Sequence, residues 1–283
     1  MRILGIIIVY FPDSNLKFNI NSYLPYIDKL IFWENSPEEK AEYIPQSSKL
    51  EKMGLNRNVG IGKALNEAVN YAIENGYTHL LTMDQDSYFE SNKFKTYLEI
   101  IEKTNQEIIY SPNYKIYGKE MYDPTEASLI EVEANMTSGS IYPISIFNKI
   151  GLFRDDFFID SIDLEFCMRA RKNNIPTKIV PLVNLVHKVG YQKKKYRFLW
   201  KTFFPNEYSP IRSYYIVRNG IITMRLYPWA NWKGFLFYWF YKRLFFVLCY
   251  EKEKYMKCKG LIIGYLHGKR GVTGEQKIFL DNE

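Results

Sequence analysis

The stretch TMDQDS at residues 82–87 follows a short apolar run at residues 78–81 and decides the fold. Such a run is typical of a buried strand, so Asp84 and Asp86 stand where that strand ends, at the rim of a sheet. Open α/β sheets bind their ligands at this rim. Side chains alternate along an extended segment, so both carboxylates are expected to point to the same side.

Two carboxylates in this arrangement suit Mg²⁺ or Mn²⁺. These cations take oxygen ligands and are usually held by one or two carboxylates together with substrate phosphates. Asp84 and Asp86 therefore predict a substrate that carries a diphosphate. An acidic loop without a metal is the alternative, and this short pattern alone does not decide between the two.

The chain has 283 residues, of which 47% are hydrophobic and 24% charged. These values indicate a folded protein with one large core and an appendage. The three cysteines show no paired spacing, so we expect a reducing compartment and no disulfide. No apolar run reaches the length of about 18 residues that a membrane-spanning helix requires. The net charge of +7 fits nucleic acid, a membrane surface or an anionic substrate equally well.

Strand and helix patterns alternate through the first part of the chain, which predicts an α/β fold. Residues 3–10 are apolar at consecutive positions, as in a parallel strand covered on both faces. The period of the apolar positions predicts a helix at residues 60–75. The other expected elements are strands at 28–33, 49–55, 107–111 and 177–186, and helices at 90–103 and 144–150.

The glycine-rich segment at residues 58–62 stands at the start of the predicted helix. Backbone amides at a helix N-terminus bind phosphate readily, and Arg57 would neutralise part of its charge. The segment is not a P-loop, because no Gly-Lys-Ser/Thr follows at the required spacing. A tight turn before the helix explains the glycines equally well.

A second acidic cluster, FFIDSIDLEFCMR, occupies residues 157–169. Asp163 lies at or near the first turn of a predicted helix and is the candidate general base. When a metal-bound diphosphate leaves a sugar carbon, the acceptor hydroxyl must lose its proton, and one carboxylate suffices for this. A single displacement inverts the anomeric centre. Asp160 is either part of the site or a helix N-cap, and Glu165 and Arg169 have the spacing of a surface pair.

His187 follows the predicted strand at residues 177–186. A single histidine is often structural, but this one is placed at another strand end. Its neutral imidazole would complete the coordination of a metal held by Asp86.

Taken together, seven motifs resemble those of bacterial family 2 glycosyltransferases with a GT-A fold, in particular the rhamnosyltransferase-like branch. The similarity extends over essentially the whole chain. The motifs are IIIVY at 6–10, NRNVGIGKALN at 56–66, LTMDQDS at 81–87, TSGS at 137–140, FIDSIDLEFCMRA at 158–170, His187 with Gly190, and SYYIVRN at 213–219.

The resemblance implies a role for each matching residue. The nucleoside pocket would contain Tyr10 and Asn35, with Asn58 and Gly60 nearby. Asp84 would contact the ribose or sugar of the donor, Asp86 would bind the metal, and His187 would join the metal and diphosphate. The catalytic base would be Asp163. The implied acceptor-side residues are Ser138, Gly139, Asp160, Arg218 and Phe166, the last of which replaces the tryptophan usual in close relatives.

The resemblance also implies a domain division. Residues 1–192 would form the GT-A catalytic domain, with a Rossmann-like nucleotide-sugar half at 1–112, an acceptor half at 113–192 and a mixed sheet. Residues 193–283 would form a C-terminal, aromatic-rich helical extension.

The C-terminal region is basic and aromatic, with Lys193, Lys194 and Lys195 at its start and many aromatic residues at 227–250. An apolar face with lysines at its border is typical of a helix that lies in a membrane interface. Packing within a helical subdomain or against a dimer partner is the alternative. Binding of nucleic acid is less compatible, because no known recognition motif accompanies the aromatics.

The sequence therefore predicts an inverting, Mg²⁺- or Mn²⁺-dependent glycosyltransferase on the cytoplasmic face of a bacterial membrane. We expect it to move L-rhamnose from dTDP-rhamnose to a lipid-linked glycan, without a nucleic-acid partner and with a homodimer as one open possibility. A UDP-hexose or UDP-galactofuranose donor would leave the motifs unchanged. A non-catalytic glycan-binding partner is the alternative from another class.

Overall fold

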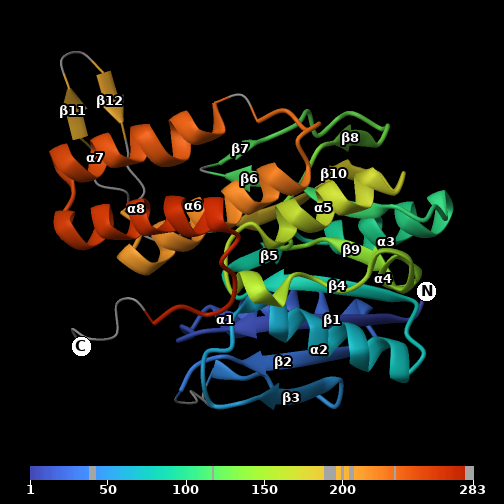
Figure 1. The fold of residues 1–283 in the computed structure, drawn as a ribbon. Helices are drawn as coiled ribbons and strands as arrows, with labels where there is room; N and C mark the ends of the chain where they lie inside the picture. The colour runs from blue at the N-terminus through green and yellow to red at the C-terminus, as the bar shows by residue number, and fades with distance from the viewer. Residues whose placement is uncertain are drawn as a thin grey trace. The chain divides into compact units, whose positions relative to one another are not determined.

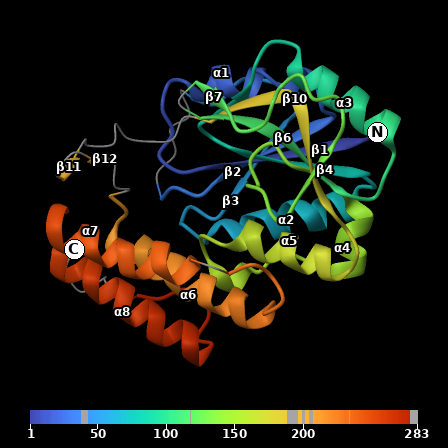
Figure 2. The ribbon, with the colours of Figure 1, turned by 90° about the horizontal axis from the view of Figure 1, so that it is seen from above.

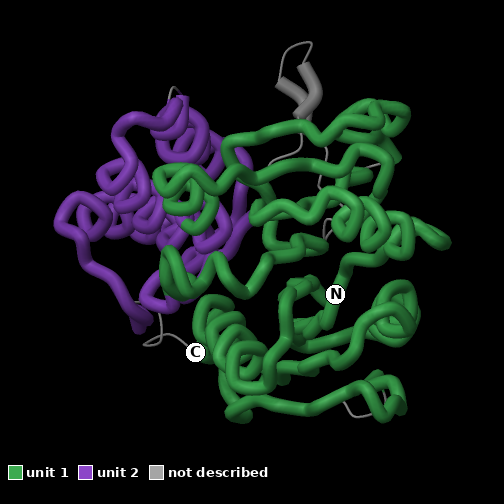
Figure 3. The backbone as a smooth tube through the Cα atoms, turned by 90° about the vertical axis from the view of Figure 1, so that its right-hand side faces the viewer, with its two compact units in different colours: residues 1–154, 166–189 green, residues 155–165, 190–283 purple. Residues whose placement is uncertain are grey.

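The computed structural model describes residues 1–37, 43–116, 118–187, 196–198, 201–203, 207–232 and 234–277. They form two compact units (Figure 3). The first comprises residues 1–154 and 166–189, and the second comprises residues 155–165 and 190–283. The chain therefore passes from one unit to the other within a single helix, α5 (Ile162–Lys172).

In the described residues of the first unit, ten strands form one sheet with the order β3-β2-β1-β4-β9-β6-β10-β5, to which β7 and β8 add at β6 and β10. The strands are β1 (Ile3–Val9), β2 (Lys29–Glu34), β3 (Leu50–Gly54), β4 (His79–Asp84), β5 (Ser87–Phe89), β6 (Ile109–Ile116), β7 (Lys119–Glu120), β8 (Ile130–Val132), β9 (Ile141–Pro143) and β10 (Thr177–His187). The first four are mutually parallel and lie side by side in Figure 1.

Strand β9 makes the sheet mixed, because it runs antiparallel to both β4 and β6. Strand β6 therefore runs in the same direction as β4, and β10 is parallel to β6. The carboxyl ends of β1, β2, β4 and β10 consequently lie at the same edge of the sheet. The predicted mixed sheet is confirmed.

Helices cover both faces of this sheet. Figure 2 shows α2 (Ile61–Glu74) and α4 (Ile144–Ile150) on one face, and α1 (Leu16–Asn21) and α3 (Lys93–Thr104) on the other. Strand β1 is apolar at every position except Gly5, and its side chains are buried on both faces. A parallel strand needs this composition because helices exclude water from both of its sides.

Local patterns located most elements to within two or three residues. The helix expected at 60–75 is α2, and the short helix at 144–150 is α4, which ends before Gly151 at φ 81°. Helix α3 begins at Lys93, later than expected, because Asn92 adopts the left-handed conformation at φ 61°. Strand β6 extends to Ile116, beyond the predicted 107–111, because long-range pairing with β10 continues there.

The second unit is mainly helical, as predicted. Its described elements are η3 (Asp155–Phe157), the start of α5, the hairpin β11 (Tyr196–Phe198) and β12 (Lys201–Phe203), α6 (Pro210–Leu226), η4 (Phe237–Tyr241), α7 (Lys242–Tyr250) and α8 (Lys254–Arg270). Helices α6 and α8 pack very closely. A Cβ atom at Gly264 would lie 2.6 Å from the main-chain oxygen of Tyr214, so only glycine permits this approach.

Candidate active site

The site is built on strand ends that the sheet register aligns. Strand β1 pairs with β2 and β4 so that Val9 lies beside Glu34 and Ile8 beside Asp84. The chain therefore leaves all three strands at the same level. Polar residues that follow buried strands gather here, since the edge of a covered sheet is the first place where they reach solvent.

Three side chains converge at this edge as the sequence predicts. Asp84, Asp86 and His187 each offer one ligand atom, and these atoms all lie within 4.8 Å of one another. Nδ1 of His187 lies 3.4 Å from a carboxylate oxygen of Asp86 and 2.8 Å from the hydroxyl oxygen of Ser87. The three residues are half-buried, so the group remains open on one side.

Strand pairing explains how a histidine one hundred residues away reaches the aspartates. Strand β5 begins directly after Asp86 and pairs antiparallel with β10, so that Ser87 faces His187. Two carboxylates and an imidazole, with an open side for water and phosphate oxygens, fit Mg²⁺ or Mn²⁺.

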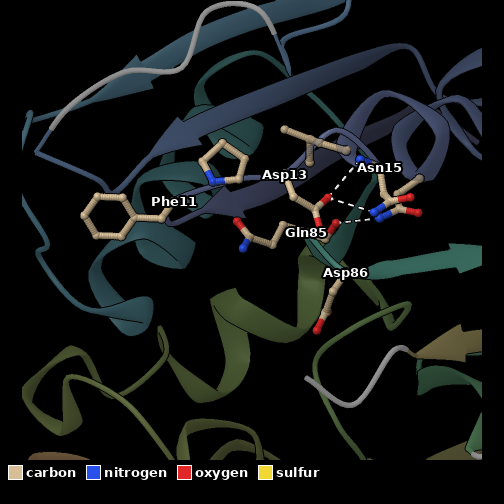
Figure 4. A pocket seen from close by; sticks show the side chains of 8 residues that line it. Phe11, Asp13, Asn15, Gln85 and Asp86 are labelled. Carbon is tan, nitrogen blue, oxygen red and sulfur yellow. Dashed lines mark hydrogen bonds between the residues drawn. The ribbon is translucent and has the colours of Figure 1, made fainter. Parts of the chain in front are cut away.

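Burial raises the pKa of Asp86 above its usual range, while the nearby His187 acts in the opposite direction. A cation held here would offset the cost of keeping this carboxylate ionised. Asp13 lines a small pocket of about 70 Å³ beside Asp86. Figure 4 shows the Asp13 carboxylate turned toward Asn15, whose main-chain and side-chain N–H groups both donate to it, at 2.8 and 3.2 Å.

Gln85, between the two aspartates, joins β4 to the end of β1. Its side-chain oxygen accepts from the main-chain N–H of Tyr10 at 2.8 Å, and its amide nitrogen donates to the main-chain oxygen of Tyr10 at 3.0 Å. Asn19 donates to the main-chain oxygen of Gln85 at 2.7 Å. The turn that carries the aspartates is thus fixed from both sides.

An exposed aromatic pair stands at the end of β1. Tyr10 and Phe11 are 47% and 49% exposed, and their rings meet edge to face with centroids 4.6 Å apart. Phe11 has φ 47°, and a bulky residue in this conformation costs about 1–3 kcal/mol. Its main-chain N–H donates to the hydroxyl of Ser36 at 2.8 Å. Rings held apart from the core in this way suit stacking against a planar base.

Asn35, Asn58 and Gly60 come together as expected. Asn35 donates to the side-chain oxygen of Asn58 at 3.0 Å, and the N–H groups of Val59 and Gly60 donate to Asn35 and Asn58 at 3.0 and 2.9 Å. These two amides are already bonded within the loop, so the tight-turn interpretation accounts for the geometry without a phosphate. Arg57 is exposed beside them.

Three candidate residues at this edge escaped the sequence interpretation: Phe11, Gln85 and Glu34. Glu34 ends β2 and is buried. One of its carboxylate oxygens accepts from the N–H of Ser36 at 3.0 Å, while the other has no hydrogen-bond partner in the part of the chain that the structure describes. The sequence signal that could have indicated these residues is their position, since each one ends an apolar strand or directly follows it.

Ser138 and Gly139 lie beneath the site. Ser138 is fully buried, and its hydroxyl oxygen accepts from the main-chain N–H of Asp84 at 3.1 Å. Gly139 has φ 78°, and a Cβ atom there would lie 2.7 Å from Pro112 and 2.9 Å from Leu185. The structure therefore places both residues as supports of β4. The resemblance had implied a place beside the acceptor instead.

Phe166 is also buried, which corrects the expectation that it faces an acceptor. Its ring has no exposed surface and packs against Phe153 and Phe147, with centroids 4.4 and 5.2 Å apart, and against Tyr142 at 5.7 Å. Phe166 is therefore a core residue of the first unit.

The carboxylates of the second acidic cluster, Asp160, Asp163 and Glu165, lie in the second unit. Helix α5 begins at Ile162, so Ser161 and not Asp160 is the residue that flanks it, and Asp163 stands in its first turn. Burial raises the pKa of Asp163 to about 6, with Asp160 adding to the rise. Arg212 donates to Asp160 at 3.2 and 3.4 Å. A carboxyl with this pKa is suited to accept a proton near neutral pH.

Two further residues differ from their expected setting. Glu165 is buried and accepts from the hydroxyl of Tyr227 at 2.7 Å, so it does not lie on the surface. Arg218, expected at the acceptor side, has no exposed surface, and its guanidinium donates to main-chain oxygens of Asp156, Phe157 and Gly274. Gly190 and Lys193–Lys195, named in the sequence interpretation, lie outside the described residues.

The chain is similar in sequence to two named glycosyltransferases. The chain is 28% identical over 244 residues, 80% of each sequence, to dTDP-rhamnosyl transferase RfbF of Shigella flexneri. It is 21% identical over 96% of its length to the low-salt glycan biosynthesis hexosyltransferase Agl10 of Haloferax volcanii, of which it covers 92%. No model of a known protein family matches the chain.

Two solved structures share its architecture. S. aureus TarS 1–349 in complex with UDP-GlcNAc matches with a TM-score of 0.62 over 95% of this chain and 81% of TarS, at 14% identity. The chain has the GT-A fold. GalNAc-T7 with UDP, GalNAc and Mn²⁺ also matches with a TM-score of 0.62, at 13% identity, over 99% of this chain and 57% of its own. The resemblance stated from the motifs is confirmed, and the comparisons support a glycosyltransferase function.

We expect Asp86→Ala to weaken Mn²⁺ binding in the presence of a nucleoside diphosphate by about tenfold or more, because it removes a charged ligand worth more than about 1.4 kcal/mol. Isothermal titration calorimetry measures this loss. The matched control is Asp13→Asn, which lines the same pocket but lies outside the ligand group. Equal loss in both variants, or none in Asp86→Ala, would contradict the metal site.

Proposed function

We propose that the chain is an inverting, Mg²⁺- or Mn²⁺-dependent glycosyltransferase that moves L-rhamnose from dTDP-rhamnose to a lipid-linked glycan. The observation that carries the proposal is the convergence of Asp84, Asp86 and His187 at the carboxyl edge of the sheet. The rhamnosyl donor is supported by the sequence similarity to a protein named as a dTDP-rhamnosyl transferase.

Each candidate residue has a task in this reaction. Asp86 and His187 would hold the metal, which when bound neutralises charge on the leaving diphosphate. Asp84 would contact the ribose or sugar, and the Tyr10 and Phe11 rings would receive the base. Asp163 would take the proton of the acceptor hydroxyl as its oxygen attacks the anomeric carbon from the face opposite the diphosphate.

Donor identity is the finer part of the proposal. TarS and GalNAc-T7 were solved with UDP-GlcNAc and with UDP and GalNAc, so a UDP-sugar is the competing donor. The exposed rings at the end of β1 would stack on either pyrimidine. Stacking alone therefore does not decide between the two donors, so the nucleotides must be compared by affinity and the sugar by product analysis.

We expect dTDP to bind more tightly than UDP or GDP, and only with Mn²⁺ present. Calorimetric titration with each nucleotide, with and without metal, measures this order, followed by product analysis with dTDP-rhamnose. Tighter binding of UDP would overturn the rhamnosyl donor but leave the reaction class in place. Failure of all three nucleotides to bind would overturn the catalytic proposal and favour a glycan-binding role.

We expect Asp163→Asn to lower kcat by about 10²–10⁴-fold, because it removes the general base. In the wild type, kcat should fall as pH drops through about 6, where Asp163 becomes protonated. The matched control is Asp155→Asn, an exposed acid of the same segment. Full activity in Asp163→Asn, or an equal loss in Asp155→Asn, would rule out this assignment.

Unfolding measurements separate this effect from misfolding. Because burial raises the pKa of Asp163 from 3.8 to about 6, the protonated form is favoured in the folded state. The contribution of this carboxyl group to the free energy of unfolding is fully present below pH 3.8 and is lost as pH rises through about 6. Asp163→Asn should therefore be at least as stable as the wild type at pH 8.

Membrane docking is the second detailed part of the proposal, after the identity of the donor. The helical segment of η4 and α7 has two sides. One side packs in a small core that includes Val217, Val247 and Leu261. The other side, here called the aromatic face, consists of exposed Phe237, Tyr238, Trp239, Tyr241 and Phe245.

The charge around the aromatic face favours a membrane surface as its partner. Lys242 lies over the Tyr238 ring at 5.0 Å, and Lys252 and Lys254 are exposed nearby in the chain. Aromatic rings bordered by lysines suit an interface of anionic lipids. In the described residues, every helix is too short or too polar to cross a bilayer.

We expect the double variant Trp239→Ser/Phe245→Ser to bind anionic phosphatidylglycerol vesicles about tenfold more weakly, since each ring contributes about 1 kcal/mol or more of partitioning free energy. Vesicle co-sedimentation measures this. The control is Met121→Ser, which removes an apolar residue that is 61% exposed in the first unit. Dimerisation abolished by the double variant, without vesicle binding by the wild type, would show instead that the face is a subunit interface.

A further inference from the structure

The segment that leads into α5 has an unusual backbone. Phe158, Asp160 and Ser161 have φ values of 64°, 64° and 63°, which lie in the left-handed region. None of them is glycine, so the Cβ atom of each makes this conformation unfavourable. Local sequence preferences do not hold such a loop, and contacts from elsewhere in the fold must do so.

Asn219 of α6 supplies the central contact. Its amide nitrogen lies 2.9, 2.8 and 2.9 Å from the main-chain oxygens of Phe157, Ile159 and Asp160, to which it donates. The side chain is fully buried. The two N–H groups of one amide are thus shared among three carbonyls between the end of η3 and the start of α5.

Arg218 orients this amide and extends the contact. Its Nε donates to the side-chain oxygen of Asn219 at 2.8 Å, which fixes which side of the amide faces the loop. Its Nη2 donates to the main-chain oxygens of Asp156 and Phe157 at 3.2 and 3.1 Å, and its Nη1 to Gly274 at 2.6 Å. The guanidinium also lies over the Tyr215 ring at 4.7 Å.

The same helix holds the loop at two more points. The Phe158 ring stacks on Tyr215 with centroids 5.3 Å apart, and Arg212 pairs with Asp160 at 3.2 Å. Arg212 and Asn219 are seven residues apart, which is two helical turns, so both lie on one side of α6. The side chains of Arg212, Tyr215 and Asn219 that contact the loop therefore all project from α6.

We infer that Asn219, oriented by Arg218, is a positioning residue that holds the loop at residues 157–161, with its three left-handed residues, and so fixes Asp163 at the start of α5. This inference rests on the proposed function, in which Asp163 is the base. The side chain of Asn219 acts through the loop and does not itself react.

The test is Asn219→Asp, which keeps the shape but replaces the donating amide with a carboxylate that faces three carbonyl oxygens. We expect kcat to fall at least tenfold while the affinity for donor nucleotide with Mn²⁺ stays within twofold. The pH at which kcat falls should also shift, because the charged groups described around Asp163, namely Asp160 with its partner Arg212, would be displaced. Hydrogen–deuterium exchange at residues 157–161 should become faster.

The matched control is Asn113→Asp. Asn113 is also fully buried and donates to main-chain oxygens, those of Tyr122 and Pro181, but it belongs to the first unit. We expect it to lower the melting temperature and leave the pH profile of kcat unchanged. If Asn219→Asp fails to fold, the same measurements are made on Arg218→Lys. Lysine lacks the planar guanidinium whose N–H groups reach both Asn219 and the loop.

The outcomes separate the inference from the proposed function. Unchanged kcat and pH profile in Asn219→Asp, or the same loss in Asn113→Asp, would overturn the inference. If the wild type transfers no sugar from any donor, the proposed function fails. Hydrogen–deuterium exchange then remains as the test of whether Asn219 holds the loop. Faster exchange at 157–161 would then support the contact from α6, and unchanged exchange would overturn it.

Discussion

The parallel pairing of β1 with β2 and β4 is the constraint on which the rest of the structure depends. Parallel strands are stable here because helices cover both faces, and this requires side chains that are apolar at nearly every position. Polar groups are thereby confined to the positions where the strands end. The register places these ends at one level, so residues distant in sequence, such as Asn35 and Asp84, emerge together.

Backbone strain follows the proposed chemistry closely. Nine non-glycine residues of the described chain have positive φ, and five of them are asparagine or aspartate, which adopt this conformation more readily than other residues. The other four are Phe11, Phe158, Ser161 and Glu253. Three of these four lie in the two segments that we assign to binding of the donor nucleobase and to the general base. Strain of this kind persists only where surrounding contacts impose it, and it is concentrated at functional sites.

The sequence was sufficient for the elements and for naming the three residues of the candidate metal site. Apolar runs and periodicity locate β1, β4 and α2 because these signals are local. Asp84 and Asp86 are neighbours in the chain, and a strand-end position suggested His187. What the sequence could not provide is the register of β5 with β10, which alone brings His187 to Asp86. That pairing depends on contacts between segments about one hundred residues apart.

Burial of polar side chains was the other feature that the sequence did not predict. Ser138 and Arg218 occur in motifs that resemble those of a known family, and both were expected beside an acceptor, yet neither has exposed surface. A sequence pattern reports that a residue type is required at a position but not whether it contacts a ligand or supports a residue that does. Gln85 illustrates the same point, because its two bonds to Tyr10 give it a structural task between two candidate ligands.

Arg218 shows why this distinction matters for function. Burying a guanidinium is costly, and hydrogen bonds to carbonyl oxygens and contact with aromatic rings only partly offset that cost. An apolar side chain of similar volume is often as stable or more so at a buried position. An apolar residue, however, would neither orient Asn219 nor bind the carbonyls of residues 156 and 157. The charge therefore contributes conformational specificity to one loop, and that loop leads directly to Asp163.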